Sequence, residues 1–169
     1  MKKMLPVLVT LVLAALLAVF FLNRQESTSF ITIAKGNHDA RPLPMLPGKV
    51  YQDTECGMPV EQKEFSAQAV DGKGRTWFFD DPGCLVLWLD GRKDAATLTL
   101  WVHGKQGVGW LDARQAWYAR TDLTTPMHYG FCPYPQPQDG YVDFATMTRL
   151  MLRGENLTNP YVRKELLNR

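Results

Sequence analysis

The sequence predicts an α+β protein: an N-terminal transmembrane helix, then two strand-strand-helix-strand units that share an antiparallel sheet. Three observations support this fold class. An uncharged run of nineteen residues lies near the N-terminus, apolar residues alternate beside glycine-rich turns, and helix-capping residues precede segments with one apolar face. We expect a signal anchor or transmembrane helix at 1–24, a proline-rich tether at 25–47 and a folded domain at 48–169. The approximate halves of the domain are 48–107 and 108–169.

The N-terminal run extends from Met4 to Leu22 and follows Lys2 and Lys3. As a helix it is about 28 Å long, close to the ~30 Å of a bilayer's hydrocarbon core. Lysines before such a run favour a cytoplasmic N-terminus. No small-residue cleavage site follows, which favours an uncleaved signal anchor over a cleaved signal peptide. We therefore expect a single-pass protein of the cytoplasmic (inner) membrane, with its domain facing the periplasm or cell exterior.

The tether is polar at first, and Arg41–Pro47 then has three prolines in seven positions, which favours an extended chain. Within the tether, Phe30–Ile33 is expected to form a short strand that docks on the domain. The first unit begins with alternation over 64–70, a turn at 71–74 and a returning strand at 75–79, a pattern typical of a hairpin.

A helix is predicted from Pro82 to about Leu89, with Asp81 as its N-cap and Gly91 just beyond its end. Asp80 and Asp81 could also form a metal or acid-base pair, but capping explains at least one of them and is the interpretation we prefer. Alternation over 96–102 predicts the next strand.

The second half is expected to repeat this order. Its predicted elements are a strand at 108–111, a strand within 112–120, an extended segment at 127–131, a helix capped by Asp139 or Asp143 and ending at Gly154, and a short helix after Asn159.

The stretch with the clearest chemistry is Cys56-Gly57-Met58. A thiolate and a thioether are soft donors, which select Cu(I) over hard cations. Gly57 lets the backbone fold until both sulfurs face one centre. Because such pairs also occur as core filling, this tripeptide alone is a weak signal of a metal site.

The composition excludes some classes. Lys2 and Lys3 account for the whole formal net charge of +2, and no block of like charge marks a nucleic-acid surface. We expect no nucleic-acid partner. The three cysteines are an odd number, so at least one thiol is spare. Cys56 is the candidate for use; the alternatives are three buried cysteines, or a Cys84–Cys132 disulfide.

Several of these stretches, in order, resemble the NosL family, accessory proteins of nitrous oxide reductase. The matching pieces are Cys56-Gly57-Met58, the strand-turn-strand ending in Phe79-Asp80-Asp81-Pro82, Trp110-Leu111-Asp112-Ala113, Ala116-Trp117-Tyr118, Thr125-Pro126-Met127 and Tyr129-Gly130. The resemblance extends from about Cys56 to Gly130, less than half of the chain.

The resemblance implies a copper chaperone outside the cytoplasm, without catalytic activity. Members of the family are commonly lipoproteins anchored through an N-terminal cysteine, whereas this chain is expected to be anchored by its N-terminal helix. Such a protein would hold Cu(I) and deliver it to nitrous oxide reductase or another copper enzyme, with an ABC-type membrane complex of the same assembly system as a further partner. Cys56, Met58 and Met127 match the family's sulfur ligands. His128 stands where the family often has a small residue, so here a nitrogen ligand could join or replace a sulfur.

Two other functions remain open from the residues. One is a thiol-dependent or metal-assisted enzyme with Cys56 as nucleophile, although the sequence places no obvious base near it. The other is a metal-free, membrane-tethered interaction domain. Without the resemblance, Met127 and His128 are more simply a core methionine and a surface histidine.

Overall fold

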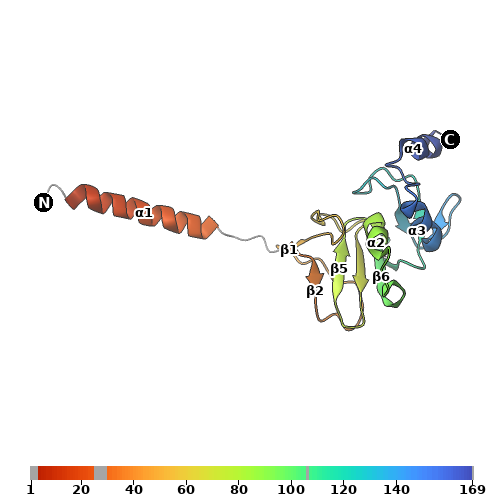
Figure 1. Ribbon diagram of the computed structural model, residues 1–169, viewed down its shortest axis with the longest axis horizontal. Coiled ribbons are helices and arrows are strands. Elements are labelled where there is room, and N and C mark those ends of the chain that lie inside the picture. The colour runs from red at the N-terminus through yellow and green to blue at the C-terminus, as the bar shows by residue number, and fades with distance from the viewer. Residues whose placement is uncertain (1–3, 25–29, 106, 169) are drawn as a thin grey trace.

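The computed structural model describes residues 4–24, 30–105 and 107–168. Its first element, α1 (Met4–Arg24), is drawn apart from the folded body in Figure 1. Among the described residues, no helix has both the length and the apolar character needed to cross a membrane. The predicted transmembrane helix, and the single-pass inner-membrane location that depended on it, are therefore wrong.

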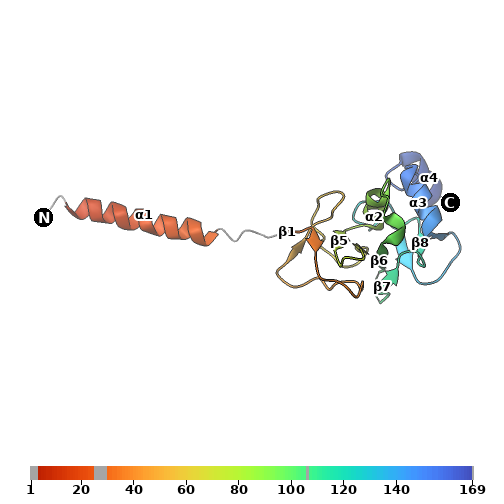
Figure 2. The ribbon, with the colours of Figure 1, turned by 60° about the horizontal axis from the view of Figure 1, so that its bottom comes forward.

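The largest sheet has five strands in the order β2-β5-β4-β6-β7, and every neighbouring pair is antiparallel. Its strands are β2 (Ile33–Ala34), β4 (Ala67–Val70), β5 (Thr76–Phe79), β6 (Thr99–His103) and β7 (Trp110–Asp112). The helix α2 (Pro82–Leu89) packs against β4 and β5, and Figure 2 shows it over this sheet. The predicted hairpin is confirmed as β4 and β5. The prediction of a docking strand at Phe30–Ile33 is confirmed by β2, which pairs with β5.

The central strands are buried on both faces because two different segments cover them. Trp77 and Phe79 of β5 pack into the main core with residues of α2. Phe78 points the other way, into a smaller core with Tyr51 and Val60. The segment after β2 contributes to that second core, and Leu43 exchanges two hydrogen bonds with the buried Gln68 side chain. Residues 30–47 are thus held against the sheet by specific contacts.

The helix α2 has the boundaries and cap that the sequence predicts. Its N-cap Asp81 accepts a hydrogen bond from the backbone N–H of Gly83 at 2.7 Å, and Pro82 occupies the first turn. Between α2 and β6 lies a 3-10 turn, η1 (Ala95–Thr97), where the alternation predicted strand. The strand β6 begins only at Thr99.

The second half forms a separate three-stranded antiparallel sheet in the order β10-β8-β9. Its elements are β8 (Trp117–Ala119), β9 (Cys132–Tyr134), β10 (Val142–Asp143), α3 (Phe144–Leu152) and α4 (Pro160–Leu167). Asp143 caps α3 and Asn159 caps α4 through side-chain hydrogen bonds. A third sheet pairs β1 (Phe30–Ile31) with β3 (Val50–Tyr51) in parallel.

The α+β class is therefore confirmed, but the predicted repeat of two units on one shared antiparallel sheet is wrong. The first half does run strand, strand, helix, strand. The second half places all three of its sheet strands before α3, and no strand follows that helix among the described residues. β7 joins the first sheet as an edge strand, which leaves β8, β9 and β10 to pair among themselves.

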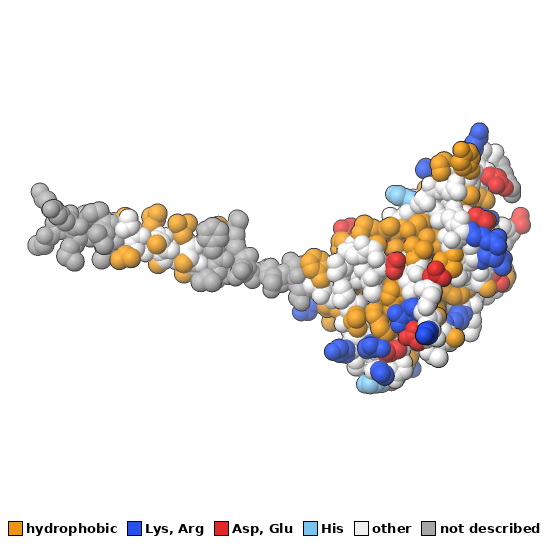
Figure 3. All heavy atoms as spheres, viewed as in Figure 1, with side chains coloured by type: hydrophobic (Ala, Val, Ile, Leu, Met, Phe, Trp, Pro, Cys, Tyr) orange, Lys and Arg blue, Asp and Glu red, His pale blue; other side chains and the backbone are white. Residues whose placement is uncertain are grey.

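One core joins the two halves. Leu85 and Val86 of α2 lie in the same buried cluster as Tyr118, Met147 and Met151. Figure 3 shows hydrophobic side chains gathered over the part of the surface where α2 lies, with acidic and basic side chains intermixed around it. The contacts of Leu85 and Val86 in this shared core fix the N-terminus of α2 relative to the second half. The site described next includes a residue of that N-terminus.

Candidate metal centre

Asp53 shapes the loop that carries Cys56. Its Oδ1 accepts hydrogen bonds from the backbone N–H groups of Glu55, at 2.7 Å, and Cys56, at 2.9 Å. Its own N–H donates to the carbonyl of Met58 at 2.8 Å, and its carbonyl accepts from Gly57 at 3.0 Å. Gly57 has a φ of +77°, in the left-handed region that favours glycine. The glycine of the tripeptide thus closes a tight turn behind Cys56.

The same carboxylate fastens this loop to the end of β5. Asp53 is 1% exposed, and its Oδ2 accepts the backbone N–H of Asp80 at 2.8 Å. The N–H of Thr54 donates to the carbonyl of Phe78 at 2.9 Å. Two segments distant in sequence therefore meet at one buried carboxylate.

Cys84 reaches this place from the first turn of α2. Its side chain is 1% exposed, whereas Cys56 is exposed. Asp81 orients the turn through both carboxylate oxygens: Oδ1 accepts from Gly83, and Oδ2 accepts the backbone N–H of Met127 at 3.1 Å. The cap of α2 is therefore also a link to the second half of the chain.

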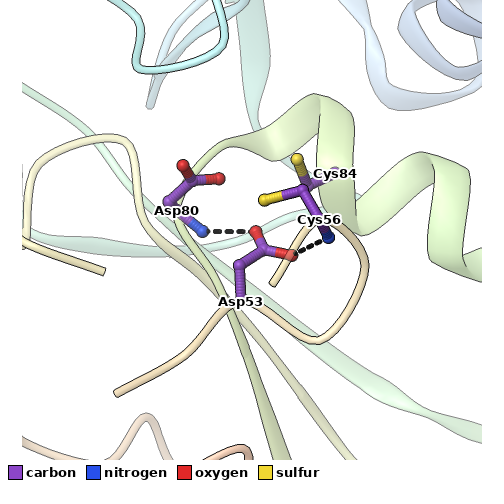
Figure 4. A group of neighbouring side chains, drawn as sticks. All are labelled: Asp53, Cys56, Asp80 and Cys84. Atoms are coloured by element: carbon purple, nitrogen blue, oxygen red, sulfur yellow. Dashed lines mark hydrogen bonds between the residues drawn. The ribbon is translucent and has the colours of Figure 1, made fainter. Parts of the chain in front are cut away.

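Asp53, Cys56, Asp80 and Cys84 each offer one ligand atom, and these atoms all lie within 4.8 Å of one another. Figure 4 shows the sulfurs of Cys56 and Cys84 beside each other, with the Asp53 carboxylate hydrogen-bonded to two backbone N–H groups. Three of the four residues are buried. Such a cluster of thiols and carboxylates can hold a metal ion.

Desolvation keeps both thiols protonated at neutral pH. Although the Cys56 residue is exposed, partial desolvation of its thiol raises the pKa to about 11, and the charges of Asp53 and Asp80 add to the shift. Burial and the same acidic neighbours raise the pKa of Cys84 far above its usual range, although a helix N-terminus ordinarily lowers a thiol pKa. A metal ion that binds here must displace these protons, so its affinity should rise with pH.

The two neighbouring aspartates are also shifted. Burial raises the pKa of Asp80 to about 8, with a hydrogen bond to Asp53 and the charge of Asp53 adding to it. Burial raises the pKa of Asp81 to about 7, against the opposing effect of its hydrogen bonds from Gly83 and Met127. Ionising these groups together would crowd negative charge in one place, so a bound cation would favour their ionised forms.

The cluster contains one of the four residues predicted as metal ligands, Cys56. Met58 is 40% exposed and lines a neighbouring cavity together with Asp80. Met127 is half-buried and packs against the main core, next to the backbone link with Asp81. His128 is exposed, with a φ of +55°, and lines a different cavity with Leu123. The ligand roles of Met58, Met127 and His128 stay predictions.

The sequence does not predict that Asp53, Asp80 and Cys84 lie beside Cys56. Of the two roles open to Asp80 and Asp81, a metal or acid-base pair or helix capping, the capping by Asp81 is confirmed. The predicted alternative of a Cys84–Cys132 disulfide is wrong, since all three cysteines are unpaired in the described chain. A local signal for Cys84 existed, because it lies in the first turn of the predicted helix, and a helix N-terminus ordinarily favours the thiolate form that binds metals.

Gly83 gives a test of how tightly this corner is packed. A Cβ at this position would lie 2.3 Å from Cδ2 of Tyr129. Alanine in a helix normally stabilises relative to glycine, but here the overlap should dominate, so Gly83→Ala should lower the free energy of unfolding by about 1–3 kcal/mol. Chemical denaturation measures the change. Gly72→Ala is the matched control, because nothing lies within 4 Å of its added Cβ. A Gly83→Ala protein as stable as wild type would contradict this packing.

Comparison with known proteins adds no identification: no known family matches the chain, and no curated protein does.

Proposed function

We propose that this protein binds a single Cu(I) ion between Cys56 and Cys84 and passes it to a copper enzyme. The observation that carries the proposal is the pair of thiols brought into one cluster by two separate elements, the loop after β3 and the first turn of α2. Two thiolates are soft ligands that suit Cu(I).

The carboxylates fit this proposal as supporting groups. Asp53 already accepts three backbone hydrogen bonds, so most of its lone pairs are in use. Hard carboxylate oxygens are poor ligands for a soft ion. We assign Asp53 to positioning Cys56, and Met58 remains the candidate third ligand because it follows Cys56 by two residues.

The asymmetry of the two thiols suits transfer. Cys84 is buried and Cys56 is exposed, so an incoming ligand can reach the ion from the side of Cys56. Copper would leave by ligand exchange, with the Cys56 sulfur released first. A site with few ligands and one open side favours such exchange over permanent storage.

The recipient that we propose is nitrous oxide reductase or another copper enzyme, with an ABC-type membrane complex as a further partner. This part rests on the sequence resemblance to the NosL family. The proposed role needs no catalysis, and Cys56 is poorly suited to be a nucleophile. Its pKa is raised to about 11 by burial, so little thiolate forms at neutral pH.

Zn²⁺ is the second candidate ion, favoured by one observation. Oδ1 of Asp80 is buried and has no hydrogen-bond partner. Zn²⁺ accepts both thiolate and carboxylate ligands, so Cys56, Cys84 and Asp80 would suit it. A Zn²⁺ site of this kind would be a resident site with no role in copper transfer.

Cu(I) titration against a chromophoric chelator, without oxygen, tests the proposal. Wild type should bind one ion tightly, and Cys56→Ser and Cys84→Ser should each weaken binding by about a hundredfold or more, which corresponds to about 2.7 kcal/mol. Cys132→Ala, which removes a buried cysteine outside the cluster, should change affinity little. Parallel Zn²⁺ titration separates the two ions. No tight Cu(I) site in wild type, or a site indifferent to both serines, would overturn the proposal.

The same titration decides the remaining predicted ligands. Met58→Leu and Met127→Leu remove each thioether while keeping volume, and His128→Gln removes the ring nitrogen. If a thioether binds the ion together with the two thiolates, removing it should lower the Cu(I) affinity about tenfold. Unchanged affinity in a variant excludes that side chain as a ligand.

A further inference from the structure

Cys56 and Cys84 bring two sulfurs together beside one buried carboxylate. The ligand atoms of the cluster, both Sγ atoms included, all lie within 4.8 Å of one another, and Figure 4 shows the two sulfurs beside each other. Oδ1 of Asp53 accepts the backbone N–H of Cys56, and its Oδ2 accepts that of Asp80, just before α2. These hydrogen bonds hold the backbone on both sides of the sulfur pair, and they need no metal ion.

Two thiols at this separation can also bond to each other. An S–S bond is about 2.0 Å long, so the sulfurs need to approach by less than about 3 Å. Cys56 can supply this movement, because it is exposed in the turn that Gly57 closes and rotation about its Cα–Cβ bond swings the sulfur. Cys84 is 1% exposed and stays in the first turn of α2.

The third cysteine of the described chain lies elsewhere. Cys132 belongs to β9, is fully buried, and packs in a separate cluster with Phe65 and Ala119. Its sulfur is not among the ligand atoms grouped with Cys56 in the described residues. Of the three possible cysteine pairs, only Cys56 and Cys84 are therefore placed for bonding in the part of the chain that the structure describes.

We propose that Cys56 and Cys84 form a reversible disulfide in the metal-free protein, and that this disulfide must be reduced before Cu(I) binds. The oxidant is an organic disulfide, which reacts first at the exposed Cys56. The Cys56 sulfur forms a mixed disulfide with it and releases one thiol; the Cys84 sulfur then attacks Cys56 and releases the second. The two cysteines lose two electrons and two protons, and the oxidant becomes two thiols that carry them.

The disulfide and the metal ion compete for the same two sulfurs. An S–S bond leaves neither cysteine with the thiolate that Cu(I) needs, whereas bound Cu(I) occupies both sulfurs and blocks the exchange. Copper loading therefore has to follow a reaction of the disulfide-reducing class. This regulatory part of the inference rests on the proposed copper function, while the disulfide itself rests on the placement of the two cysteines.

Equilibration of the metal-free, full-length protein with excess oxidised glutathione, followed by acid quenching and thiol alkylation in denaturant, tests the disulfide. Wild type should lose two of its three alkylatable thiols and keep Cys132, and peptide mapping should recover Cys56 linked to Cys84. Because the pKa of Cys56 is raised by desolvation, the exchange is slow at neutral pH, so the incubation continues until alkylation no longer changes.

Two variants serve as matched controls. Cys84→Ser should accumulate glutathione on Cys56, because the thiol that resolves the mixed disulfide is missing. Cys132→Ala should form the Cys56–Cys84 disulfide as wild type does. A mixed disulfide that persists on Cys56 of wild type, or three free thiols at equilibrium, overturns the disulfide whatever the copper titration shows.

Cu(I) titration of the oxidised protein tests the regulatory part. Binding should be about a hundredfold weaker or more than in the reduced protein, and treatment with a phosphine reductant, followed by its removal, should restore it. Protein loaded with Cu(I) before exposure to oxidised glutathione should keep all three thiols. Equal Cu(I) affinity of the oxidised and reduced forms overturns this competition. A disulfide in a protein whose reduced form lacks a tight Cu(I) site overturns the copper function and leaves the disulfide standing.

Discussion

Asp53→Ala is expected to lower the free energy of unfolding by about 3–5 kcal/mol, among the larger effects that one substitution can have. The carboxylate is 1% exposed and accepts three backbone N–H groups, those of Glu55, Cys56 and Asp80. Each donor left without an acceptor in a buried place costs about 1–3 kcal/mol, and part of the loop can recover bonds to water.

Urea denaturation of the metal-free protein measures this loss, with Asp94→Ala as the control. Asp94 forms an ion pair with Arg92, but the Asp94 side chain is 44% exposed, so its removal should leave the unfolding midpoint almost unchanged. The stability of Asp53→Asn should lie between that of wild type and that of Asp53→Ala. The amide keeps one acceptor oxygen, but its NH₂ group cannot accept a hydrogen bond from the remaining N–H donor. Equal effects of the substitutions at Asp53 and Asp94 would show that Asp53 does not hold the loop.

Metal binding should report the same role for Asp53. If it positions Cys56, then Asp53→Asn should weaken Cu(I) binding even under conditions where the protein stays folded. Circular dichroism of each variant establishes that the fold is retained. Wild-type affinity in a folded Asp53→Asn protein would mean that Cys56 keeps its position without this carboxylate.

The parts of the fold that the sequence predicts well are those with local causes. The hairpin of β4 and β5 follows from alternation around a glycine turn, and α2 follows from its Asp81 cap and Pro82. The prediction failed for residues 127–131. This segment is predicted to be extended, but the chain turns there, with the N–H of His128 bonded to the carbonyl of Thr125.

The candidate site could be predicted only in part, because its assembly depends on long-range contacts. Cys56 was identifiable from its own tripeptide. Its meeting with Cys84 depends on the hydrogen bond from Asp80 to Asp53, between residues 27 positions apart. No periodicity encodes such a contact. The prediction for the N-terminal helix failed in a different way. The composition clearly predicted a membrane span, yet the described helix does not have the length and apolar character that a span requires.

Asp80→Asn is expected to stabilise the metal-free protein at pH 8, by about 2 kcal/mol or more, although most substitutions of buried residues destabilise. Burial raises the pKa of Asp80 to about 8, and its contact with Asp53 adds to the shift. Asparagine is neutral at every pH. Its amide N–H can donate to the Asp53 carboxylate as the protonated carboxyl does, so it keeps the favourable state of the folded protein.

The sign of the pH dependence follows from proton binding. Between about pH 4 and pH 8 the folded protein keeps the proton on Asp80, while the unfolded chain releases it. Unfolding therefore releases a proton, and wild-type stability should fall as pH rises through this range and then level off. Asp81, with a pKa raised to about 7 by burial, contributes in the same direction. Asp80→Asn should remove the larger part of this slope.

Thermal and urea unfolding of wild type and Asp80→Asn at pH 5 and pH 8 tests the prediction. Asp71→Asn is the control of opposite sign: burial raises the pKa of Asp71, but hydrogen bonds from Arg75 outweigh it, so the net pKa is lowered. That substitution should destabilise at pH 8. If Asp80→Asn instead destabilised the protein at pH 8, Asp80 would be ionised in the fold.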